Sequence, residues 1–144
     1  MVKDIEAAIE IAAPLERVWS VLTHPGDVEK WLGCLNYRPQ VGAVFHMQQD
    51  NARRQRGDIS GAIHCEVEAL ERPKRFAFSW YFPDMPKTHV EIVTAHSDTG
   101  TLAKLTHSGW NEYPPAQAQP VRDGLAQGWT GFVLPMLKKV AEGG

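Results

Sequence analysis

Apolar and polar residues alternate along much of the first hundred residues, which is the pattern of strands half-buried on a core. In residues 3–12, Ile5, Ile9 and Ile11 fall on one face and acidic residues on the other. The same alternation, bounded by turn residues, recurs in five later segments. We therefore predict six strands, over residues 3–12, 43–49, 58–71, 75–82, 88–96 and 101–109.

Helical spacing replaces the alternation at three places. Residues 14–22 predict a short helix that begins at Pro14, and Asp27 favours the start of a second short helix. A longer stretch, 117–141, predicts an amphipathic helix. Pro135 lacks a backbone N–H, so we expect this helix to be disturbed between residues 131 and 135. Its predicted apolar stripe is Val121, Leu125, Trp129, Phe132, Val133, Met136 and Val140.

This order of elements predicts an α+β fold in a single domain of residues 1–144. One strand, two short helices, five further strands and a long helix favour a curved antiparallel meander of about six strands, wrapped on the C-terminal helix. A strongly curved sheet closed by one helix leaves space unless large side chains fill it. We therefore expect a hydrophobic cavity there, in the range of about 300–1,000 Å³ that is typical of ligand pockets.

Composition narrows the functional classes. The chain has 144 residues, 43% of them hydrophobic, and a formal net charge of −2. This charge gives no general attraction to phosphate backbones, so we expect no nucleic-acid partner. No apolar stretch is long enough to span a bilayer, and the N-terminus is acidic where a secretory signal is apolar. We expect a cytoplasmic protein in which Cys34 and Cys65 are buried thiols.

The motifs of common enzyme classes are absent, because the sequence contains no phosphate-binding loop, no GxGxxG, no HExxH and no CxxC. None of the six histidines pairs with another at i, i+4, so we expect no metal and no cofactor. The stretch from Arg53 to Arg56 predicts a solvated hairpin loop.

His107 is the one candidate for chemistry, because it alternates with Ala103 and Leu105 on the apolar face of the last strand. Two interpretations are open. The side chain either lies in the cavity, where it orients a ligand or exchanges a proton near neutral pH, or it is a structural histidine bonded to a backbone carbonyl.

The large apolar residues of the predicted sheet and helix are interpreted either as core or as the wall of the cavity. We expect the ligand-binding residues to be Trp31, Phe45, Phe78, Trp80, Leu105, His107, Trp110, Trp129, Phe132, Val133 and Met136.

Several local sequences are similar to a known family when taken in order. They are residues 11–19, Val28-Glu29-Lys30-Trp31, Gly61, residues 71–80, residues 105–110 and Gly128-Trp129. In this order the chain resembles the START-like or SRPBCC superfamily, the helix-grip fold shared with the Bet v allergens and the polyketide cyclase/aromatases. Within that superfamily it looks most like the family of homologues of the activator of the heat-shock protein 90 ATPase. The resemblance implies the helix-grip fold along nearly the whole chain.

Three functions remain open at this stage. The first is binding of a small hydrophobic or aromatic molecule without catalysis. The second is an interaction module that acts on a chaperone or another protein. The third is an enzyme of the cyclase or hydrolase type with His107 as general acid or base. The chain is expected to be a monomer or a homodimer, since an exposed edge strand can support pairing.

Overall fold

The alternating segments form one antiparallel sheet in the computed structural model, which describes residues 2–143. All six predicted strands are confirmed, and a two-residue strand that the sequence did not reveal makes a seventh. The strands are β1 (Ile5–Ile11), β2 (Cys34–Leu35), β3 (Val44–Met47), β4 (Ile63–Glu71), β5 (Arg75–Tyr81), β6 (Thr88–Ser97) and β7 (Gly100–Ser108).

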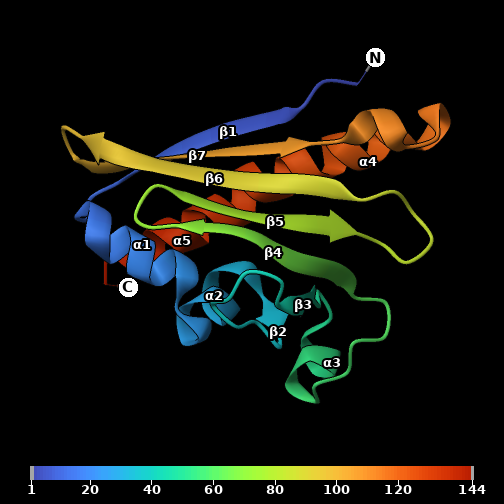
Figure 1. The fold of residues 1–144 in the computed structure, drawn as a ribbon, viewed down its shortest axis with the longest axis horizontal. Coiled ribbons are helices and arrows are strands. Elements are labelled where there is room, and N and C mark those ends of the chain that lie inside the picture. Colours follow the sequence, from blue (N-terminus) through green and yellow to red (C-terminus); the bar gives the residue numbers. More distant parts are fainter. Residues whose placement is uncertain (1, 144) are drawn as a thin grey trace.

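The strand order across the sheet is β1-β7-β6-β5-β4-β3-β2, so the chain runs as a meander from β2 to β7 and β1 closes the far edge beside β7 (Figure 1). Between β6 and β7, Val90 pairs with His107 and Ile92 with Leu105. These four side chains are buried on the inner face of the sheet. The intervening residues, such as His89 and Glu91, therefore lie on the outer face.

Helices cover the inner face only. Helices α1 (Leu15–Thr23) and α2 (Pro25–Leu32) follow β1 and pack against the end of the C-terminal helix, which crosses behind the sheet in Figure 1. That helix is continuous through α4 (Pro115–Gly128), the π-helical segment η2 (Trp129–Val133) and α5 (Leu134–Ala141). The predicted α+β helix-grip architecture is confirmed. Within residues 2–143 no helix is long and apolar enough to cross a membrane.

The predicted disturbance of the long helix is also confirmed, and it changes which side chains of the helix face the sheet. Pro135 has no N–H, and the N–H of Leu134 donates to the carbonyl of Trp129, five residues back. One extra residue in this turn rotates the following side chains by about 100° about the helix axis. The buried stripe therefore runs from Trp129 to Leu134 and Leu137.

The predicted placement of Phe132, Val133 and Met136 on the stripe facing the sheet is therefore wrong in part. The side chain of Phe132 is 79% exposed and that of Met136 is 40% exposed, while Val133 is only half-buried. The physical reason is the π-turn, because the stripe was extrapolated with an unbroken α-helical period across residues 129–133.

The region between β3 and β4 also differs from the prediction. Strand β4 begins at Ile63 rather than near residue 58, because Gly61 adopts a left-handed turn conformation with φ +74°. In place of a simple hairpin loop, Asn51–Gln55 forms a helical turn, α3. Arg54 is anchored there by a bond to the carbonyl of Gln48, so this arginine is a structural residue of the turn.

A β-bulge in β4 changes which residues face outward. The pairing shifts between Val67, which is opposite Phe78, and Ala69, which is opposite Ala77. The extra residue is Glu68, which is exposed. Bulges of this kind change the phase of a strand, and here Ala69 lies on the outer face with Glu68 while Leu70 turns toward the core.

Candidate functional site

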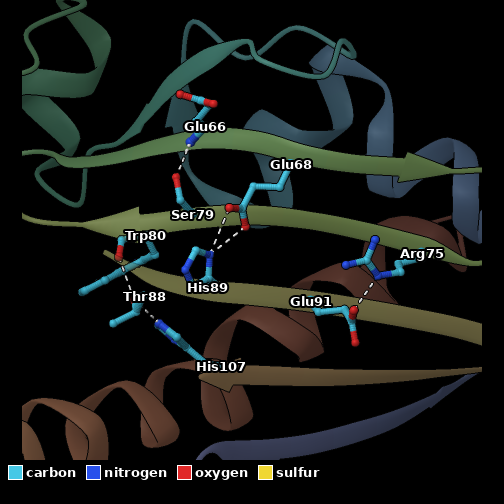
Figure 2. Close-up of polar contacts among 9 residues, drawn as sticks. All are labelled: Glu66, Glu68, Arg75, Ser79, Trp80, Thr88, His89, Glu91 and His107. Atoms are coloured by element: carbon cyan, nitrogen blue, oxygen red, sulfur yellow. Dashed lines mark hydrogen bonds and ion pairs between the residues drawn. The ribbon is translucent and has the colours of Figure 1, made fainter. Parts of the chain in front are cut away.

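His107 lies at the centre of a hydrogen-bond chain on the inner face of the sheet. The indole Nε1–H of Trp129 donates to Nδ1 of His107 over 3.1 Å. That leaves the ring proton on Nε2, which is 2.7 Å from the Thr88 hydroxyl. The Thr88 hydroxyl donates onward to the carbonyl of Trp80 over 2.6 Å, as Figure 2 traces. Both ring nitrogens of His107 are therefore occupied within the protein.

This environment holds the imidazole neutral. Burial lowers the pKa of His107 to about 3, and the nearby His89 adds a smaller effect in the same direction. The expectation that His107 exchanges a proton near neutral pH is therefore wrong, because no water reaches a ring that is fully buried. The ring of His107 bonds an indole and a hydroxyl, and not the backbone carbonyl that the structural interpretation expected.

Aromatic rings enclose His107 on three sides. Its ring centroid lies 5.4 Å from that of Trp80, 4.7 Å from that of Trp110 and 5.9 Å from that of Trp129. The indole N–H of Trp110 donates to the backbone carbonyl of His107 over 3.0 Å. The ring of Tyr113 packs on Trp110 with centroids 5.3 Å apart. We call these five residues the His107 cluster.

Two polar atoms of the His107 cluster make no hydrogen bond within residues 2–143. They are the indole Nε1 of Trp80 and the hydroxyl of Tyr113, and both are buried. A buried donor without a partner costs roughly 1–3 kcal/mol, so such atoms are rare in native proteins. The hydroxyl of Tyr37, on the other side of the core beside Phe45, is in the same condition.

The predicted ligand-binding residues are brought together only in part. Trp80, His107, Trp110 and Trp129 belong to the His107 cluster, and Leu105 lies one inward position along β7. Phe45 of β3 and Phe78 of β5 pack edge-on with centroids 5.4 Å apart, and they form a second aromatic group with Tyr37. Trp31 is tied to α1 by a bond from its indole N–H to the carbonyl of Val21.

Thr88 and Tyr113 at this site, and Tyr37 in the second aromatic group, were not predicted from the sequence. Thr88 alternates with Val90 and Ile92, so its inward position could have been found from the strand period. Tyr113 lies just after η1 (Trp110–Glu112), where no periodicity applies, and Tyr37 lies in an irregular segment. For these two tyrosines the sequence carries no signal of burial.

The buried thiols take no part in chemistry. Cys34 and Cys65 are unpaired and buried, as predicted. Burial raises the pKa of Cys34 to about 12 and that of Cys65 well above its usual value, so neither thiol supplies the reactive thiolate at neutral pH.

Two pockets among the described residues lie on the outer face of the sheet, whereas the cavity expected from the sequence would lie on the inner face. The larger, about 360 Å³, is lined by Glu68, Arg75, Ala77, His89, Val90, Glu91, Thr106 and Ser108. The smaller, about 290 Å³, lies over β1 and β7 near Lys104. The inner face is filled by the aromatic groups described above, as their burial indicates.

Two ion pairs border the larger outer pocket, as Figure 2 shows. Nδ1 of His89 lies 2.9 and 3.0 Å from the two carboxylate oxygens of Glu68, so this nitrogen carries a proton that it donates. Arg75 donates from Nε to Glu91 over 2.5 Å and from Nη1 to Glu71 over 2.9 Å.

Comparison with known proteins agrees with the fold. A family model described as "Activator of Hsp90 ATPase homolog 1-like protein" matches residues 12–142. No curated protein matches the chain significantly.

Among solved structures, protein MLL2253 from Mesorhizobium loti is 25% identical, with 97% of this chain and 94% of that chain aligned and a TM-score of 0.73. Protein CV1439 from Chromobacterium violaceum is 22% identical, with 99% of this chain and 100% of that chain aligned and a TM-score of 0.76. The Aha1 dimer from Colwellia psychrerythraea, solved in solution, is 20% identical, with 99% of this chain and 98% of that chain aligned and a TM-score of 0.67.

Proposed function

The chain belongs to the family of Activator of Hsp90 ATPase homolog 1-like proteins, and we propose that it binds a small, largely aromatic molecule between its sheet and its C-terminal helix without transforming it. The ligand lies against the His107 cluster, at the end of the sheet where β7 leads through η1 into α4. We place this function in the cytoplasm, where the two buried thiols stay reduced.

The observation that carries the proposal is a pair of buried polar atoms without partners, on two rings that each pack against Trp110. The Trp80 indole can only donate a hydrogen bond, and the Tyr113 hydroxyl can donate or accept one. A flat ligand with a carbonyl or hydroxyl group would offer a partner to either atom while its ring stacks among the tryptophans. Satisfying them recovers the cost of leaving them unbonded, which is a specific source of affinity.

The same end of the C-terminal helix is the part that opens most easily. Helix α4 contributes one buried residue, Ala118, whereas α5 contributes four. Segments with few buried apolar contacts open locally at low free-energy cost. We infer that η1 and the first turns of α4 move outward to admit the ligand, while η2 and α5 stay in place on the sheet.

Binding without catalysis follows from the state of His107. A general acid or base must reach the substrate with a free nitrogen and a suitable pKa. Both nitrogens of His107 are engaged, and its pKa of about 3 keeps the ring neutral at physiological pH. In this proposal His107 fixes the orientation of Trp129 and leaves the ligand chemically unchanged.

The test is a titration with 2-naphthol, a flat aromatic molecule with one hydroxyl, monitored by tryptophan fluorescence. We expect saturable quenching, and Tyr113→Phe should weaken the affinity about fivefold to tenfold because one hydrogen bond of about 1 kcal/mol is lost. Tyr81→Phe is the matched control, since Tyr81 lies at the end of β5 opposite His64, outside the cluster. Quenching that does not saturate, or equal effects of the two substitutions, would contradict the proposal.

A second candidate function is contact with another protein, favoured by the exposure of Phe132. A phenylalanine that is 79% exposed on a helix surface contributes little to the fold. The Colwellia relative is a dimer, and the family is named for activation of the Hsp90 ATPase. If this face binds a second copy of the chain, the wild type should self-associate in analytical ultracentrifugation and Phe132→Ser should not. If it binds a chaperone, the wild type should capture purified Hsp90 and Phe132→Ser should not. A monomeric protein that captures no chaperone would remove this candidate.

A further inference from the structure

The outer face of the sheet carries a hollow of about 360 Å³ on the side opposite the His107 cluster, and we propose that it binds the ammonium group of a small primary amine. This site is independent of the proposed inner ligand, because the two are separated by the sheet itself. The hollow lies over β5, β6 and β7, where Figure 2 shows the Glu68–His89 and Arg75–Glu91 pairs at its borders.

The floor of the hollow is built from small residues on central strands. Ala77 lies on β5 directly opposite Glu91 of β6, which in turn is opposite Thr106 of β7. Central strand positions favour β-branched or aromatic residues, and a methyl group at residue 77 leaves room above the strand. Ala77 is nevertheless buried, because the longer side chains around it rise on either side.

Three acceptor oxygens face this space without a partner among the described residues. The carboxylate of Glu91 uses one oxygen to pair with Arg75, and its other oxygen makes no hydrogen bond. The hydroxyls of Thr106 and Ser108 make none either within residues 2–143. Side chains directly opposite each other on adjacent strands lie about 4.5–5.5 Å apart at Cβ, so a single group can reach both Glu91 and Thr106. An ammonium group has three N–H donors and no acceptor, which matches these oxygens in number and kind.

The charges bordering the hollow favour a cation. The guanidinium of Arg75 is already compensated by two carboxylates, Glu71 and Glu91. Glu68 pairs with His89, so within residues 2–143 these pairs set three carboxylates, Glu68, Glu71 and Glu91, against one arginine. An anionic ligand would have to compete with two carboxylates for Arg75.

A metal ion is a poorer occupant than an amine. No group of three or more histidine, cysteine or acidic side chains within residues 2–143 converges to hold a metal. Glu68, on the outer face of β4, holds His89 at the edge of the hollow through its carboxylate.

The test is an NMR titration with n-butylamine at constant ionic strength, with n-butanol as the neutral probe of the same shape. We expect saturable shifts of the backbone amides of Ala77, Glu91 and Thr106 with the amine, and none with the alcohol. Glu91→Gln should weaken the binding at least about tenfold, because it removes the charge and one acceptor oxygen. Glu29→Gln on α2, an exposed carboxylate far from the hollow in sequence, is the matched control and should change the affinity less than about twofold.

A second variant separates the site from diffuse attraction to an acidic surface. Ala77→Val keeps every charge, suits a strand and fills the floor, so it should also weaken the binding at least about tenfold. The proposal is overturned if butanol binds as well as butylamine, if Glu29→Gln acts as strongly as Glu91→Gln, or if Ala77→Val leaves the affinity unchanged.

Discussion

Replacing His107 with glutamine removes the one buried group whose protonation opposes folding most strongly. In the folded protein the pKa of His107 is about 3, whereas an unperturbed histidine has a pKa of about 6.5. Between these two values the unfolded chain binds a proton that the folded protein does not. The contribution of His107 to stability is therefore fully present above pH 6.5 and is lost as the pH falls through that value toward 3.

The size of this effect follows from the two pKa values. Lowering the pH from 7 to 5 should cost the wild type about 2 kcal/mol through this histidine alone, because the unfolded state is protonated and the folded state is not. Glutamine does not titrate, and it offers an oxygen to accept from Trp129 and an amide to donate to Thr88. We therefore expect His107→Gln to fold and to lose about 2 kcal/mol less than the wild type over the same interval.

The assay is urea unfolding at pH 7 and pH 5, followed by tryptophan fluorescence for both proteins. All other titrating groups are common to the two proteins, so their contributions cancel in the comparison. Equal losses in the wild type and in His107→Gln would refute the claim that His107 is buried as a neutral ring held by Trp129 and Thr88.

Three further predictions concern the helix and the edge of the sheet. Phe132→Ala should change stability by less than about 0.5 kcal/mol because the ring is exposed, whereas Leu137→Ala should cost about 2–5 kcal/mol. Pro135→Ala should stabilise the protein by less than the ~3 kcal/mol of a straight helix, because the buried stripe requires the π-turn to persist. Gly100→Ala should cost more than about 2 kcal/mol, since its Cβ would lie 2.6 Å from the carbonyl oxygen of Ile11.

Chemical denaturation measures all four variants. A large loss of stability in Phe132→Ala would mean that the ring is buried. It would contradict the rotation of the apolar stripe at η2. A gain of the full ~3 kcal/mol in Pro135→Ala would mean that the π-turn carries no packing role. A Gly100→Ala protein as stable as the wild type would show that β1 has room to move away from β7.

The fold was accessible from the sequence because the alternation is regular wherever one face of a strand is buried. The predicted strand 88–96 agrees with β6, in which Val90 and Ile92 are buried. The two-residue strand β2 was missed because two residues cannot display a period.

The candidate site could be predicted less well from the sequence, because local irregularities shift the apolar and polar pattern of a helix or strand. The π-turn transfers burial from Phe132 and Met136 to Leu134 and Leu137, and a sequence shows Pro135 without showing how the turn responds. The bulge at Glu68 has the same effect in β4, where it brings Ala69 onto the outer face opposite Ala77.

The protonation state of His107 also could not be predicted from the sequence. Its inward position was predicted correctly from Ala103 and Leu105, yet its neutrality depends on Trp129, which is 22 residues away and bonds through the indole nitrogen. Contacts between residues so far apart in sequence are fixed by how the helix lies on the sheet, which periodicity does not describe.

Native mass spectrometry of the protein, purified from its own cells without denaturation, tests the central proposal most directly. We expect a bound molecule of a few hundred daltons that is released on denaturation. Less of this molecule should copurify with Tyr113→Phe than with the matched control Tyr81→Phe. A spectrum of the bare chain alone, from a protein that also fails to quench with 2-naphthol, would contradict a ligand site at the His107 cluster.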